Sequence, residues 1–130
     1  MNPPSPISLG GEKVPKYLIS FNDGDMSFPD EDFPAVRDAV RELRREAKSA
    51  GAWVFGGGLD DYSARSVGTD GSVKDGPLQE SPVRIGGFSV IEAASDEEAL
   101  IWARKIAVAC RCAQEVRRFN DDRGSDSPQN

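Results

Sequence analysis

Asp75 is the residue in this sequence best suited to chemistry, because it opens an Asp75-Gly76-Pro77 turn. A carboxylate held at such a turn beside an apolar pocket could act as a general base. The alternative is that Asp75 accepts backbone N–H groups and stabilises only its own turn, as aspartate commonly does. The sequence leaves both interpretations open.

Glu92 is the second acidic candidate, because it falls on the same face of a predicted strand as Phe88 and Val90. If this face is buried, Glu92 is a second acid in the pocket; otherwise it is a solvent-exposed residue at a strand end. Several aromatic side chains could line a ligand cavity or simply pack in the core: Tyr17, Phe21, Trp53, Phe55 and Phe88.

The chain of 130 residues contains no histidine, which limits the chemistry it can perform. Ser89 has no base to activate it and lacks the second glycine of a nucleophile elbow. The glycines 56–58 do not complete a dinucleotide-binding fingerprint. Cys110 and Cys112, without histidine or a second cysteine pair, cannot supply the usual zinc ligands. We therefore predict no metal site and no cofactor, and two buried or half-buried thiols.

Charge and hydropathy exclude two classes of partner. The net charge of −6 argues against a nucleic-acid surface, which needs clustered lysine and arginine. No apolar run approaches the roughly 18 residues that a membrane span requires. The N-terminal residues lack the basic and apolar regions of a secretory signal. The sequence therefore predicts a cytoplasmic protein that binds neither nucleic acid nor membrane.

The elements that must position these residues alternate between strands and helices. Composition predicts a disordered arm over 1–15, one folded domain over 16–119 and a disordered polar tail over 120–130. Within the domain, short apolar runs predict four main strands, over 16–21, 52–59, 87–94 and 113–119.

A first helix is predicted over 33–50, where apolar residues recur at three- and four-residue spacings. Pro34 falls in its first turn, and Gly51 suits the position just past its end. The predicted apolar stripe contains Phe33, Val36, Val40, Leu43, Ala47 and Ala50. The opposite, solvated side carries Arg37, Arg41, Arg44, Arg45 and Lys48.

A second helix begins at Ser95, because Ser95-Asp96-Glu97-Glu98 is a capping box. Its predicted buried stripe contains Ala99, Leu100, Ala103, Ile106 and Ala107. A small hairpin is predicted over 64–74, with Asp70-Gly71 as a type I′ turn.

This order of elements predicts an α+β fold: a βαββαβ unit of the ferredoxin-like kind with a small hairpin inserted. Both helices should cover one face of the sheet. However, Phe88 and Val90 point to one face of their strand while Ile91 and Ala93 point to the other. We therefore predict a C2 homodimer in which two sheets face each other. The alternative is that the arm and loops half-cover these residues.

A known family carries a similar pattern. Asp75-Gly76-Pro77-Leu78 precedes Gly86-Gly87-Phe88-Ser89-Val90-Ile91-Glu92-Ala93, and a helix with Ala99-Leu100 and Trp102-Ala103 follows. Together these motifs resemble the YCII-related family, and more closely its DGPF-domain branch, over roughly residues 15–118. The resemblance implies a dimeric α+β barrel, with Asp75 at the rim of a pocket between the sheet and the helices or partner. Leu78 replaces the phenylalanine of the motif, and the histidine of the family's His–Asp pair is absent.

Three functions follow as expectations. The first is a homodimeric protein that binds a small apolar or aromatic molecule, or acts as an accessory protein. The second is an enzyme in which Asp75 transfers a proton during elimination or isomerisation of a cyclic organic substrate; the missing histidine counts against it. The third is an interaction module associated with a transcription factor. The predicted pocket adds Gly76, Pro77 and Glu92 to the five aromatic residues named above.

Overall fold

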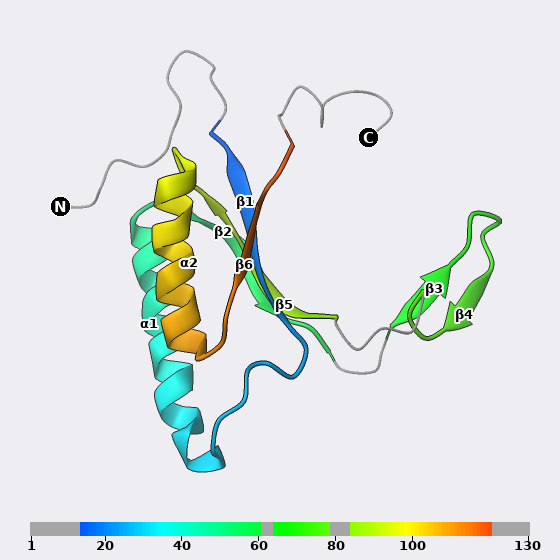
Figure 1. Ribbon diagram of the computed structural model, residues 1–130, viewed down its shortest axis with the longest axis horizontal. Helices are drawn as coiled ribbons and strands as arrows, with labels where there is room; N and C mark the ends of the chain where they lie inside the picture. The colour runs from blue at the N-terminus through cyan, green and yellow to red at the C-terminus, as the bar shows by residue number, and fades with distance from the viewer. Residues whose placement is uncertain (1–13, 61–63, 79–83, 121–130) are drawn as a thin grey trace.

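The structure is built on a four-stranded antiparallel sheet with strand order β2-β5-β1-β6 (Figure 1). It is a computed structural model that describes residues 14–60, 64–78 and 84–120. The strands of the sheet are β1 (Lys16–Asn22), β2 (Trp53–Gly58), β5 (Ile85–Glu92) and β6 (Glu115–Arg118). The predicted arm and tail lie mostly in residues 1–13 and 121–130, outside the described residues.

Two helices pack side by side on one face of this sheet, as predicted (Figure 1). They are α1 (Phe33–Ser49), which a 3-10 turn η1 (Asp30–Asp32) precedes, and α2 (Asp96–Cys110). Pro34 lies in the first turn of α1, and Gly51 follows its end with a φ of 76°, a conformation that glycine adopts without strain. The protein therefore belongs to the α+β class. No helix in the described ranges is long and apolar enough to cross a membrane.

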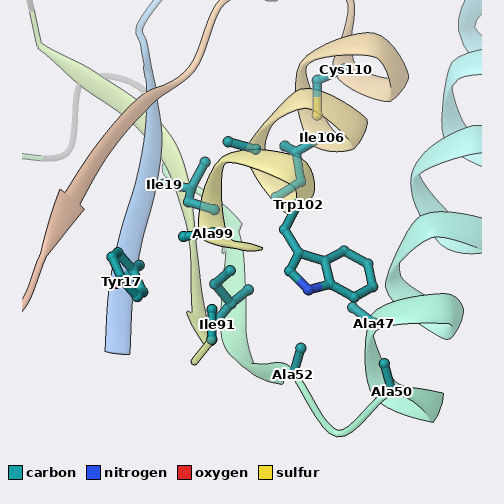
Figure 2. Close-up of a cluster of buried hydrophobic side chains, with 12 residues drawn as sticks. Tyr17, Ile19, Ala47, Ala50, Ala52, Ile91, Ala99, Trp102, Ile106 and Cys110 are labelled. Carbon is teal, nitrogen blue, oxygen red and sulfur yellow. The ribbon is translucent and has the colours of Figure 1, made fainter. Parts of the chain in front are cut away.

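The core fills the space between the helices and the sheet (Figure 2). Tyr17 and Ile91 pair across β1 and β5 and share the face that the helices cover, together with Ile19. Trp102 extends from α2 toward Ala47 of α1, so one large side chain joins both helices. The hydroxyl of Tyr17 donates a hydrogen bond of 2.6 Å to Asp96 Oδ1 and so links β1 to the first turn of α2.

The capping box at the start of α2 forms as predicted, with one difference. Ser95 Oγ accepts from the Glu98 amide at 3.2 Å, while Glu98 Oε1 accepts from the Ala94 amide at 3.1 Å rather than from Ser95. The predicted buried stripe was wrong at Leu100, which is exposed, and it omitted Trp102, which is buried. The buried side of α2 instead consists of Ala99, Trp102, Ala103, Ile106, Ala109 and Cys110. Trp102 belongs to it because its side chain packs in the core with Ala47 of α1.

The inserted hairpin consists of β3 (Arg65–Val67) and β4 (Val73–Asp75), and Figure 1 shows it away from the helices, beyond the other face of the sheet. The predicted type I′ turn was wrong. Such a turn needs positive φ at both central residues, but Gly71 has a φ of 87° and Asp70 is not in the left-handed region. The hairpin instead closes through a five-residue loop, with Gly68 N donating to Ser72 O at 2.8 Å.

Candidate functional site

An apolar cavity of about 270 Å³ lies between the sheet and the two helices. Its wall comes from every layer of the fold, because β1, β2, β5, α1, α2 and two connecting segments each contribute to it. The lining residues are Phe21, Met26, Val40, Leu43, Arg44, Trp53, Gly57, Gly58, Phe88, Ser89, Ile106, Cys110 and Gln114.

Glycines on two neighbouring strands leave the room for this cavity. Gly58 of β2 pairs with Gly87 of β5, so both positions share one face of the sheet. A Cβ at Gly87 would come within 2.6 Å of the Phe21 ring, which shows that this aromatic side chain occupies the space above it. A Cβ at Gly58 would meet only Gly86 O, at 3.9 Å. The sheet is therefore open to the cavity at Gly58.

Arg44 is the one charged side chain in the described wall of the cavity. Its guanidinium carbon lies 5.1 Å from the centroid of the Trp53 ring, a cation–π geometry. Its Nε atom is buried and has no hydrogen-bond partner within the described part of the chain. A buried N–H group without an acceptor destabilises the protein, and an acceptor placed next to it would remove this cost.

The remaining polar groups of the wall are neutral. Burial, followed by the neighbouring thiol of Cys112, raises the pKa of Cys110 to about 11, and Arg44 opposes this only partly. Burial, with Asp25 nearby, also raises the pKa of Cys112, whose carbonyl accepts from Gln114 Nε2 at 3.3 Å. Both thiols are buried or half-buried, as predicted. A thiol with a raised pKa is a poor nucleophile near neutral pH.

Phe21 and Trp53, two of the aromatic residues predicted to line a pocket, lie in the wall of this cavity. Phe88 also belongs to the wall, but the alternation along β5 directs its side chain to the opposite face of the sheet, beside Phe55. Tyr17 lies instead in the core, where burial and its hydrogen bond to Asp96 raise its pKa. Phe55 pairs with Val90, and Glu92 pairs with Lys16. Both Phe55 and Glu92 lie on the sheet face away from the helices. Glu92 is half-buried there and forms an ion pair of 3.3 Å with Lys16.

Asp75 lies at the end of β4, outside the described wall of this cavity. Its side chain is 95% exposed and faces Arg65 at 3.6 Å. The turn that follows is held by other groups: Gly76 N donates to Ala64 O at 2.8 Å, and Ser66 Oγ donates to Gly76 O at 2.6 Å. Gly76 has a φ of 103°, and Pro77 next to it is half-buried. A catalytic role of Asp75 stays a prediction.

Arg44 was predicted to lie on the solvated side of α1, and this prediction was wrong. The structure shows that Arg44 is half-buried against Trp53. A signal for this was present, because Arg44 follows Val36 and Val40 at four-residue spacing and so continues the buried ridge of the helix. Met26 and Gln114 were also missed; both lie in connecting segments, where no periodicity indicates which side chains turn inward.

Neither a scan against models of known protein families nor a search of curated proteins found a match for this chain. Among the described residues, no three side chains of histidine, cysteine, aspartate or glutamate come together as a metal site. The feature of the described residues that bears on function is therefore the cavity, with its size, its aromatic and aliphatic wall, and the one cation in that wall.

Proposed function

We propose that this protein binds a small apolar or aromatic molecule in the cavity between its sheet and its helices. The observation that carries this proposal is the volume of about 270 Å³ behind a mainly apolar wall. An apolar cavity of about 150 Å³ holds benzene, and pockets for larger ligands begin near about 300 Å³. The volume thus suits a ligand of one or two rings.

The chemistry of the wall supports binding rather than turnover. Phe21 and Trp53 offer aromatic surfaces, and Met26 can adapt its shape to the ligand because its side chain is unbranched. The described wall carries no carboxylate and no histidine, and the pKa of about 11 keeps the Cys110 thiol protonated. A general base or an activated nucleophile is needed for most proton transfers and acyl transfers. The enzyme hypothesis built on Asp75 gains no support from the exposed position of its side chain.

We further propose that the subunit is a ferredoxin-like βαββαβ unit related to the YCII-related proteins. Two observations support this: the order of elements along the chain and the antiparallel strand order β2-β5-β1-β6. The motif residues 75–78 and 86–93 support the relationship to the DGPF-domain branch.

The sheet face away from the helices supports a homodimer with facing sheets. Phe55 and Phe88 lie on this face with their ring centroids 6.1 Å apart, and Leu18 and Val90 pair beside them. The ion pair of Lys16 and Glu92 lies at one end of this apolar area. An apolar centre with a polar edge is the usual anatomy of a protein interface, and the same patch on two subunits forms a C2 dimer.

A cavity-filling variant tests the binding proposal. Gly58→Leu places a side chain in the open space above Gly58. Ala64→Leu, at an exposed position outside the described wall of the cavity, serves as the control. The probe is 2-naphthamide, an uncharged two-ring molecule, titrated by calorimetry. We expect the native protein and Ala64→Leu to bind it with equal affinity, and Gly58→Leu to bind it at least about tenfold more weakly, since a blocked pocket loses most of its contacts. Equal binding by all three proteins would place the ligand elsewhere and refute the proposal.

A further inference from the structure

We propose that the natural ligand of the cavity is an aromatic carboxylate whose anionic group binds Arg44. This inference rests on the proposed binding function and goes beyond it, because it specifies the charge of the ligand. Arg44 is the one cation in a mainly apolar described wall, and its buried Nε has no hydrogen-bond partner there.

Arg44 is the half-buried cation of the helix pair and has no acidic partner within the described residues; Arg41, Lys48 and Arg104 also form no ion pair there, but their side chains are exposed. Lys105 binds Glu46 at 2.7 Å, Arg111 binds Asp32 at 2.7 Å, and Arg45 binds Glu42 on the surface of α1. Around Arg44 the described neighbours are instead Trp53 and the neutral thiol of Cys110. A positive charge facing an apolar cavity is costly unless it is paired, and an anionic ligand can provide the pair.

The donor groups of Arg44, including its buried Nε, determine which kind of anion can pair with it. The guanidinium presents several N–H donors in a fixed plane, a geometry that matches the two oxygens of a carboxylate. Stacking against Trp53 restricts where the guanidinium can move, so the donors are preorganised for a ligand in the cavity. The hydroxyl of Ser89 and the amide of Gln114 lie in the same wall and can add neutral hydrogen bonds.

The wall also limits the kind of anion. Phe21, Trp53, Leu43 and Ile106 surround the space with apolar surface, which favours a planar hydrocarbon body. A phosphate monoester carries nearly two negative charges, and one arginine would leave the second charge desolvated and unpaired. An aromatic monoanion with one or two rings balances the charge of Arg44 and fits the volume of about 270 Å³.

The experiment compares charged and uncharged probes of equal shape on charge variants of α1. The probes are 2-naphthoate and 2-naphthamide, with benzoate and benzamide as a smaller pair, each titrated by calorimetry. Arg44→Met removes the charge and keeps an unbranched side chain of similar length, and Arg44→Lys keeps the charge without the planar fork. Arg41→Met removes a charge from an exposed position of the same helix and is the control.

We expect the native protein and Arg41→Met to bind the carboxylate of at least one pair about tenfold to a hundredfold more tightly than its amide, as for a hydrogen-bonded charge pair. Arg44→Met should lose this preference while keeping its affinity for the amide, and Arg44→Lys should retain part of it. Equal binding of carboxylate and amide by the native protein overturns the inference and leaves the proposed binding function intact. A preference that survives in Arg44→Met also overturns it. Failure of both pairs to bind the native protein refutes the binding function itself.

Discussion

At the scale of single residues, the reactivity of the Cys110 thiol depends on the access of solvent and ligand to the cavity. Its side chain lies in the wall of the cavity and is buried, and its pKa is raised to about 11. Cys112 lies only two residues further along the chain but is half-buried and outside this wall. The chain thus contains two thiols with different access to solvent.

We predict that iodoacetamide modifies Cys112 at least about tenfold faster than Cys110 at about pH 8, because Cys112 is only half-buried whereas Cys110 is buried, and a thiolate reacts only where the reagent can reach it. The raised pKa leaves Cys110 almost entirely protonated at this pH, and a ligand in the cavity should slow its reaction further. Trypsin cleaves after Arg111, so the two cysteines fall in separate peptides and mass spectrometry can follow each. Equal rates would contradict the buried position of Cys110.

Residue types alone did not locate the wall of the cavity. Asp75 stood out because a carboxylate next to Gly-Pro is locally distinctive, yet the pocket that it would need is formed by segments far apart in the sequence. The aromatic residues Phe21 and Trp53 could be predicted, since they lie on the inward face of amphipathic strands. Arg44 could not be singled out by its type, because its importance comes from Trp53 on another element and from the absence of an acidic partner among the described residues.

At the scale of elements, local signals located the helices and strands well. The capping box placed the start of α2, and Pro34 with Gly51 bracketed α1. The consecutive apolar residues Trp53, Val54 and Phe55 were harder to interpret. A β-bulge explains them: Trp53 pairs with Ile91 and Phe55 with Val90, so Val54 is the extra residue and its neighbours point to opposite faces. Sequence periodicity cannot distinguish such a bulge from a strand that is buried on both sides.

We predict that Ser95→Ala lowers the free energy of unfolding by about 1 kcal/mol, because the Glu98 amide loses its acceptor at the start of α2. The control is Ser49→Ala at the exposed last residue of α1, which should change the free energy of unfolding by less than about 0.5 kcal/mol. Urea unfolding followed by circular dichroism measures both. If Ser95→Ala unfolds at the same urea concentration as the native protein, the cap does not stabilise the helix.

At the scale of the whole molecule, the face of the sheet that the helices do not cover has an apolar centre formed by Leu18, Phe55, Phe88 and Val90. Phe55 is 62% exposed in the single chain, next to Phe88 of the neighbouring strand. We predict that light scattering gives a mass near twice the 14.0 kDa of one chain, because a second copy buries this face. Phe55→Lys should shift the mass to that of one chain, since a charge at the centre of the interface is left unpaired.

Val108→Lys provides the matched control, because Val108 is 75% exposed on α2, on the other side of the molecule from this face. It makes the same change from an exposed apolar residue to lysine and should leave the mass at that of two chains. The two variants together separate a specific interface from general association of exposed apolar side chains. If both variants lower the mass equally, the contact is not confined to the sheet. A native protein with the mass of one chain would refute the facing-sheet dimer, while the cavity, which lies within a single subunit, would still be open to the ligand tests.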